Sequence, residues 1–166
     1  KSCAHALYRS LILALVIGCG MLVLSDIWAP MGFELAGGSE DVQLLGDEYL
    51  SIRVWEMPLV LFLLAINGFF LGTANAVAPL WLALTANLVN IAADYALIFG
   101  NWGAPELGIV GAAWASVLGN TVACAIAVVL ALRRYKTYLI EPFNGFWERK
   151  QLLLIFSTNS SLLGRT

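Results

Sequence analysis

The chain has 166 residues, of which 60% are hydrophobic and only 12% are charged, and its mean hydropathy is +0.82. A soluble domain is about 45–50% apolar and about 25% charged, so a soluble fold of this length would leave much apolar surface in water. The composition therefore excludes an ordinary soluble domain and indicates an all-α integral membrane protein. The net charge of −2 gives no sign of nucleic-acid binding.

Four segments are long and apolar enough to cross a bilayer, which takes about 20 residues of helix. In chain order, we predict these transmembrane helices at residues 11–28, 52–71, 78–99 and 108–132. The chain then divides into a four-helix region (1–132), a basic and aromatic linker between two bundles (133–151) and the start of another transmembrane helix (152–166). Because that last helix is incomplete and the first residue is Lys1 rather than Met, we expect a piece of a longer protein.

The charges between the predicted spans indicate how the helices cross the membrane. The loop at 29–51 carries five acidic residues and no Lys or Arg, whereas 133–151 is rich in Arg and Lys. Lys and Arg gather in cytoplasmic loops. Four spans place the N-terminal end and the linker on one side, and both are basic, so parity and charge agree. We therefore predict that both lie in the cytoplasm and that the third span runs outward.

The third predicted span contains three polar residues that project in one direction. At about 100° per residue, Asn87, Asn90 and Asp94 fall within about 60° of one another on the helix. A carboxylate inside a membrane is costly and so needs a partner or a purpose. These groups offer hard oxygen ligands for a small cation, and the carboxyl could also take up and release a proton. The alternative is structural, with Asp94 bonded to a neighbouring helix and never titrating.

The second predicted span has polar residues at its outer end and one further in. Arg53 and Glu56 are three residues apart, which favours a local ion pair at the interface. Pro58 follows within the first turns, where a helix start or kink is tolerated. Asn67 lies on nearly the same face as Glu56, and it either reaches the cavity of Asp94 or makes an interhelical hydrogen bond.

The fourth predicted span combines a small-residue stripe with a polar face. Gly111, Ala115 and Gly119 recur every four residues, which is typical of close helix packing, and Gly68 and Gly72 repeat the pattern in the second span. Ser116 and Asn120 line the adjacent face of the fourth span, where they satisfy backbone groups or contribute ligands. The sequence has no phosphate-binding loop and no cysteine–histidine cluster, so we predict neither an enzyme nor a bound cofactor.

Several stretches, taken in order, resemble the multidrug and toxin extrusion (MATE) transporters, and the branch named for DNA damage-inducible protein F most of all. The similarity covers residues 49–132, and a weaker similarity follows at 159–166. Its strongest parts are YLSIR at 49–53, Pro58, GFFLG at 68–72, Pro79-Leu80, NLVNIAAD at 87–94 and LGIVGAAWAS at 107–116. The sequence departs from the family at the uncharged turn 73–78 and at Glu56, where a small residue is usual.

The resemblance implies that the chain is a fragment of a 12-helix transporter, comprising the third to sixth helices of the N-lobe and the start of the seventh. Such a protein is an antiporter of a bacterial cytoplasmic membrane that exports organic, cationic or amphipathic, compounds in exchange for H⁺ or Na⁺. It further implies that Asn90 and Asp94 belong to the cation site, with Na⁺ as the one metal expected there. Asn87, Asn67, Ser116 and Asn120 are the accessory candidates.

Two other functions compete with this one. A flippase for lipid-linked precursors shares the helix count but favours basic residues along its cavity, and the predicted spans show almost none. A non-transporting membrane subunit would use Asp94 only to pair helices. In each case the expected partners are the bilayer and the remaining helices of the same protein, together with a small organic substrate for the transporter.

Overall fold

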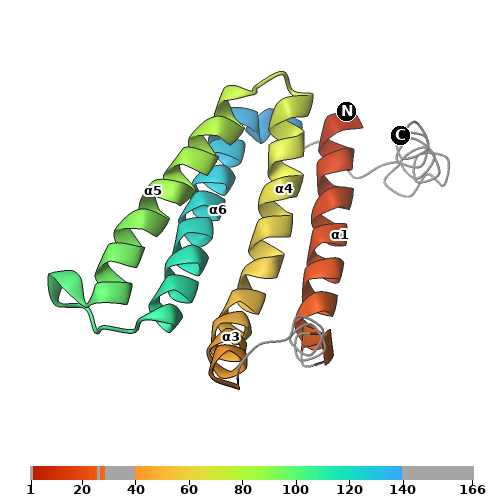
Figure 1. Cartoon of the computed structure of the whole chain (residues 1–166). Helices are drawn as coiled ribbons and strands as arrows, with labels where there is room; N and C mark the ends of the chain where they lie inside the picture. Colours follow the sequence, from red (N-terminus) through yellow and green to blue (C-terminus); the bar gives the residue numbers. More distant parts are fainter. Residues whose placement is uncertain (1, 26, 29–39, 140–166) are drawn as a thin grey trace, which may run out of the picture.

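The computed structural model describes residues 2–25, 27–28 and 40–139, and the regular elements in this part of the chain are all helices (Figure 1). They are α1 (Ser2–Val23), α3 (Glu40–Arg53), the short 3-10 helix η1 (Val54–Glu56), α4 (Met57–Gly72), α5 (Val77–Phe99), the 3-10 helix η2 (Asn101–Gly103) and α6 (Ile109–Leu139). The all-α fold class predicted from the sequence is confirmed.

The long helices pack as two antiparallel pairs. α1 lies along α4, α5 lies along α6, and contacts between α4 and α6 join the pairs (Figure 1). The start of α1, the α4–α5 turn and the last turns of α6 therefore share one end of the bundle. α3 and the α5–α6 connection lie at the other end, which the charge pattern predicts to be outside.

Among the residues that the structure describes, four helical segments are long and apolar enough to cross a membrane, as in a multi-pass membrane protein. They are Ala4–Val23, Val42–Gly72, Val77–Phe99 and Ile109–Lys136. Large apolar side chains stay exposed on these helices, Val16 and Leu80 among them. Such surface suits lipid or further helices rather than water.

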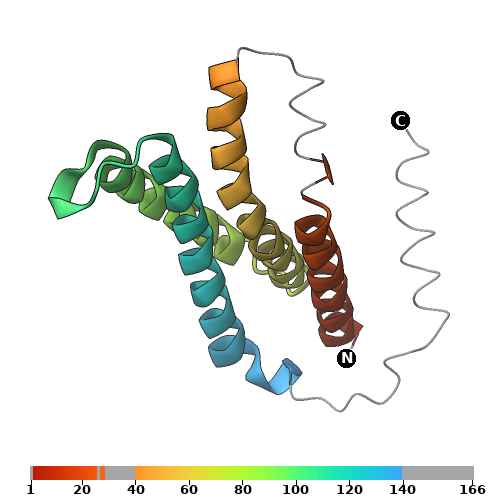
Figure 2. The same ribbon diagram turned by 90° about the horizontal axis from the view of Figure 1, so that it is seen from below.

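The second of these segments bends sharply. Figure 2 shows α3 turning away from the axis of α4, with η1 at the corner. Pro58 stands in the first turn of α4, as predicted, where its missing N–H costs little. The interpretation of residues 40–51 as loop is wrong. This segment is too polar to be recognised as part of an apolar transmembrane helix. Its Glu, Gln and Leu residues are nevertheless good helix formers.

The helix ends differ from the predicted spans because apolar composition marks the lipid-crossing part of a helix and not its ends. α1 begins at Ser2 and includes Arg9, which is buried. α6 continues past residue 132 to Leu139, with a break in helical geometry at Tyr135. The predicted linker thus begins as helix, and the rest of it, like the predicted helix at 152–166, lies outside the described residues.

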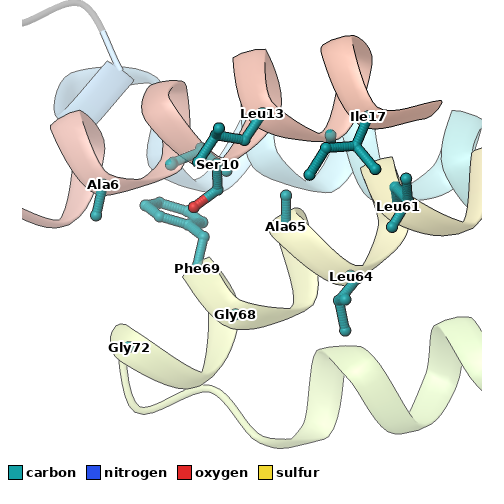
Figure 3. A pocket seen from close by; sticks show the side chains of 12 residues that line it. Ala6, Ser10, Leu13, Ile17, Leu61, Leu64, Ala65, Gly68, Phe69 and Gly72 are labelled. Atoms are coloured by element: carbon teal, nitrogen blue, oxygen red, sulfur yellow. The ribbon is translucent and has the colours of Figure 1, made fainter. Parts of the chain in front are cut away.

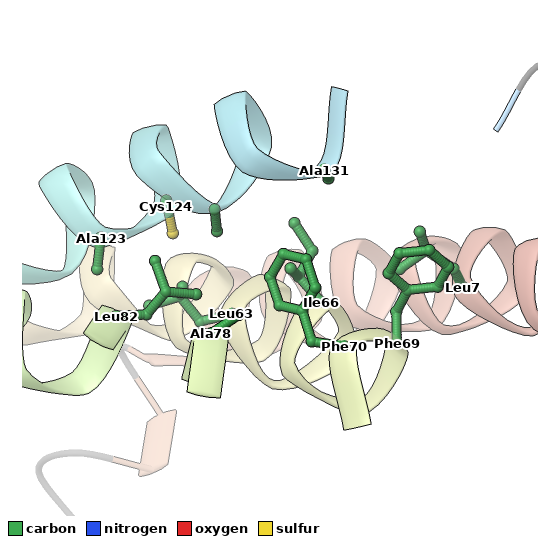
Figure 4. Close-up of a cluster of buried hydrophobic side chains, with 11 residues drawn as sticks. Leu7, Leu63, Ile66, Phe69, Phe70, Ala78, Leu82, Ala123, Cys124 and Ala131 are labelled. Carbon is green, nitrogen blue, oxygen red and sulfur yellow. The ribbon is translucent and has the colours of Figure 1, made fainter. Parts of the chain in front are cut away.

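A cluster of buried apolar side chains joins all four long helices (Figure 4). Phe70 of α4 and Leu82 of α5 are the largest fully buried side chains, and they face a row of alanines on α6. At the inner end, the Tyr135 ring packs edge-on against Phe69 with 5.2 Å between centroids, while the Asn75 amide donates to the Tyr135 hydroxyl (3.1 Å). The bent end of α6 is thereby fastened to the α4–α5 turn.

The two glycine stripes have different surroundings. On α6, a Cβ added at Gly111 or Gly119 would lie 2.5 or 2.6 Å from a carbonyl oxygen of α5, so this stripe is a contact between close helices. On α4, a Cβ at Gly68 or Gly72 would meet no atom within 4 Å. Those two glycines instead border an apolar groove of about 520 Å³ between α1 and α4 (Figure 3).

Candidate functional site

The Asn90–Asp94 pair lies on α5, on the side that faces α6. Both side chains are half-buried. The orientation of the Asn90 amide is assigned from its neighbours, because the opposite orientation would set the amide oxygen against the Asp94 carboxylate and the amide nitrogen against the Ser116 N–H. With Nδ2 donating to Asp94 Oδ2 (3.2 Å), Oδ1 accepts from the Ser116 hydroxyl (3.3 Å) and from the Ser116 backbone N–H (3.1 Å). Asn90 is therefore held between its own helix and α6, and one of its N–H groups points at the carboxylate.

This contact depends on the closeness of α5 and α6. Gly119 lies one turn from Ser116, and a Cβ there would be 2.6 Å from the Ala86 carbonyl oxygen and 3.3 Å from Asn90 Cβ. Ala115, next to Ser116, is completely buried. Small residues on this face of α6 bring its backbone near enough for Ser116 to reach the Asn90 amide.

A second polar group meets the same region from the bend between α3 and α4. Glu56, the last residue of η1, is 5% exposed. Its Oε2 pairs with Nη1 of Arg53, which confirms the predicted local ion pair. Its Oε1 accepts from Nδ2 of Asn120 on α6. Both carboxylate oxygens thus have partners, as a buried charge requires.

A cavity of about 330 Å³ opens between these helices. Its lining is Arg53, Glu56, Ala83, Ala86, Asn87, Asn90, Ser116 and Asn120. The charges of Arg53 and Glu56 offset each other, and the remaining polar groups are amides and a hydroxyl. The cavity is therefore polar but close to neutral.

The structure separates the predicted site residues into those that meet and those that do not. Asn90, Asp94, Ser116 and Asn120 belong to one hydrogen-bonded region. Asn87 lines the cavity but donates to the Ala83 carbonyl of its own helix (2.9 Å), so it does not converge with Asp94. Neither Asp94 nor Asn67 is among the lining residues, and Asp94 reaches the cavity only through its bond to Asn90.

Asn67 lies on α4, outside the lining of this cavity. Its Oδ1 is buried and has no hydrogen-bond partner within the described part of the chain. It lies three turns along α4 from Glu56, toward the predicted inner end. An unpaired buried amide oxygen is costly, and the role of Asn67 stays a prediction.

Glu56 is the residue that sequence reasoning undervalued. Its pairing with Arg53 explained it locally, and nothing in the sequence indicated a partner on α6. The available signal was its position: it interrupts a long apolar segment and departs from the small residue usual in the similar family.

The site suits a proton or a small hard cation. A carboxylate accepts about four hydrogen bonds, and Asn90 uses one such position on Asp94, so acceptor capacity remains. Amide and hydroxyl oxygens are also the ligands that hard cations prefer. Among the described residues there is no group of three or more His, Cys, Asp or Glu side chains that could hold a metal ion.

Comparison with known proteins gives a consistent result. The MatE family model matches residues 1–96. A probable multidrug resistance protein NorM of Rhizobium meliloti is 33% identical over 129 residues, and a DNA damage-inducible protein F of Escherichia coli is 29% identical over 136 residues. These matches cover 77% and 82% of this chain but only 28% and 29% of the relatives, so the chain spans less than a third of their length.

Two solved structures share the fold. An outward-facing multidrug resistance MATE family transporter superimposes with a TM-score of 0.77 at 22% identity, over 89% of this chain and 32% of that one. An inward-facing one gives a TM-score of 0.71 at 23% identity, over 91% and 32%.

Proposed function

The chain belongs to the MatE family, and on that premise we propose that it forms part of a secondary active transporter that exports organic compounds in exchange for a cation. The resemblance predicted from the sequence is confirmed by the family match and by relatives named NorM and DNA damage-inducible protein F. The proposed substrates are cationic or amphipathic, and the proposed membrane is a bacterial cytoplasmic membrane. The basic start of α1 and the end of α6 face the cytoplasm.

The observation that carries the proposal is the Asn90–Asp94 pair. A carboxylate on an apolar transmembrane helix is expensive, and here an amide fixed by α6 is aimed at it. Had Asp94 only joined two helices, its own oxygens would bond α6. Instead Asn90 makes the contacts with Ser116, which leaves most of the carboxylate's acceptor capacity for a cation. We assign Asp94 and Asn90 as the coupling residues for H⁺ or Na⁺, and Ser116 and Asn120, which belong to the same hydrogen-bonded region, as accessory residues. Asn87 bonds its own helix and Asn67 lies outside the cavity lining, so both remain accessory candidates from the sequence alone.

Binding of the coupling cation neutralises Asp94 and alters its bond to Asn90. Because Asn90 also bonds Ser116, this change acts on the contact between α5 and α6. These helices have two arrangements, and the cation binds one of them more tightly than the other. This difference in affinity shifts the equilibrium toward the arrangement that binds the cation better. If the cation favours one arrangement and the organic substrate favours the other, binding of one promotes release of the other, and the two are exchanged.

The experiment uses the full-length protein that carries this chain, reconstituted in liposomes with an imposed proton or sodium gradient. Efflux of a cationic dye and cation flux are measured for the original protein and for Asp94→Asn. We expect Asp94→Asn to abolish gradient-driven efflux, since the amide side chain cannot be protonated. Ser10→Ala, in the α1–α4 groove away from the cavity, is the control and should behave as the original protein.

The outcomes separate the competing functions. Unchanged dye efflux and cation flux in a folded Asp94→Asn variant would refute the coupling role. Loss of the protein from the membrane, with other site variants equally unstable, would instead favour the structural subunit. Translocation of a lipid-linked precursor without dye efflux would favour the flippase.

A further inference from the structure

Glu56 has no part in the family resemblance, yet it is the most deeply buried charged side chain at the candidate site. Its two oxygens bond two different elements, Arg53 at the end of α3 and Asn120 on α6. The Asn120 amide nitrogen also lies 3.4 Å from the Ser116 carbonyl oxygen, one turn back along α6. Ser116 in turn bonds Asn90, which bonds Asp94.

These contacts link polar residues of α3, η1, α6 and α5 in one series, which passes through the carbonyl, N–H and hydroxyl groups of Ser116. It runs from Arg53 and Glu56 through Asn120, Ser116 and Asn90 to Asp94. The two carboxylates therefore stand at opposite ends of one chain of polar groups. In an apolar bundle, each member has few other partners to choose from, so moving one end affects the bonds available to the other.

We propose that Glu56 is a positioning residue for the cation site: by holding Asn120, it sets α6 in the register at which Ser116 orients Asn90 toward Asp94. This rests on the proposed function of Asp94. Arg53 has a different part, because it neutralises Glu56 and allows the carboxylate to stay buried. Its guanidinium also lies 5.8 Å from the Tyr49 ring centroid, which fixes it on the α3 side.

The Arg53–Glu56 pair lies at a bend that can act as a hinge. Arg53 and Glu56 flank the bend between α3 and α4, since Arg53 ends α3 and Glu56 ends η1. A 3-10 stretch between two α-helices is a common site of hinge motion. A change of hydrogen bonding at Asp94 is thus transmitted to the angle between α3 and α4 (Figure 2), and a change of that angle acts back on Asp94.

The test compares two neutral double variants of the full-length protein. Arg53→Gln with Glu56→Gln keeps an acceptor oxygen for Asn120, whereas Arg53→Gln with Glu56→Leu removes it. Neither leaves a buried charge without a partner. The readout is the cation concentration that gives half-maximal dye efflux in liposomes, alongside the dye concentration that gives half-maximal efflux.

We expect the Leu variant to need about threefold or more cation than the Gln variant, with the dye concentration unchanged. Asn120→Ala leaves the ion pair of Arg53 with Glu56 intact. It should raise the cation concentration for half-maximal efflux to a similar extent. Combined with Glu56→Leu, it should add little, because both cut the same bond. Thr121→Ala is the matched control, since that residue is exposed and its hydroxyl donates to the Val117 carbonyl of its own helix.

Equal cation dependence in the Gln and Leu variants would overturn the positioning role. If the Leu variant does not accumulate in the membrane, Asn120→Ala decides alone, and wild-type cation dependence there overturns the role too. If instead the proposed coupling role of Asp94 is wrong, Asp94→Asn will transport normally, whatever the Glu56 variants do. The two failures therefore give different results.

Discussion

Gly119→Ala tests whether the site depends on the close approach of α5 and α6. The added Cβ would lie 2.6 Å from the Ala86 carbonyl oxygen, whereas ordinary contact begins near 3.4 Å. The two backbones must therefore separate locally by about 0.8 Å, the difference between these distances. The obstacle is backbone rather than a flexible side chain, so the strain cannot be relieved by a change of rotamer.

The same movement acts directly on the hydrogen bonds of the site. The bonds from Ser116 to Asn90 Oδ1 measure 3.3 and 3.1 Å, so a separation of about 0.8 Å lengthens them to about 4 Å, beyond hydrogen-bond range. Overpacking of this kind costs about 1–3 kcal/mol. We therefore expect Gly119→Ala to lower both the stability of the protein and its apparent affinity for the coupling cation.

Two assays check this in the full-length protein. Thermal unfolding in detergent reports stability, and the cation dependence of dye efflux in liposomes reports the site. Gly20→Ala is the control, because a Cβ there meets no atom within 4 Å. A Gly119→Ala protein that unfolds at the same temperature and keeps the same cation dependence would show that α5 and α6 do not pack closely at Gly119.

Two further variants probe single contacts. Ser116→Ala removes the hydroxyl that bonds Asn90 but leaves the backbone N–H in place, so we expect a loss of about 0.6 kcal/mol and a modest weakening of cation dependence, measured by the same efflux assay. Tyr135→Phe removes the bond from Asn75 and keeps the ring packing on Phe69, so unfolding should show a loss of about 1 kcal/mol with cation dependence unchanged. A Tyr135→Phe protein as stable as the original would mean that the aromatic packing alone holds the end of α6.

Helical spacing places Asn87, Asn90 and Asp94 on one face, and the family resemblance singles out Asn90 and Asp94 as the pair. Sequence reasoning also predicted the ion pair of Arg53 with Glu56, which needs only a separation of three residues. Both are contacts within a short stretch of chain. The partners of these pairs on α6 could not be derived in this way, because they depend on the rotation and depth of one helix against another.

The same distinction explains the two glycine stripes. Gly68 with Gly72 and Gly111 with Gly119 have the same four-residue spacing, and the sequence predicts close packing for both. Only the stripe on α6 meets another described helix, while the stripe on α4 borders an open groove. Spacing shows that a helix has a smooth face, but the arrangement of the bundle determines what that face meets.

The sequence by itself determined the membrane environment, the all-α class and the family, since these depend on composition, on apolar length and on the order of local motifs. It also identified the residues that are too polar to lie in a bilayer without a partner or a function, and Asp94 is the clearest of these. Only the tertiary structure decided that Glu56 joins them through Asn120, that Asn87 bonds its own helix, and that the polar segment at 40–51 is helical. The physical reason is that a hydrogen bond acts over about 3 Å, so groups 64 residues apart become partners only when folding brings their helices into contact.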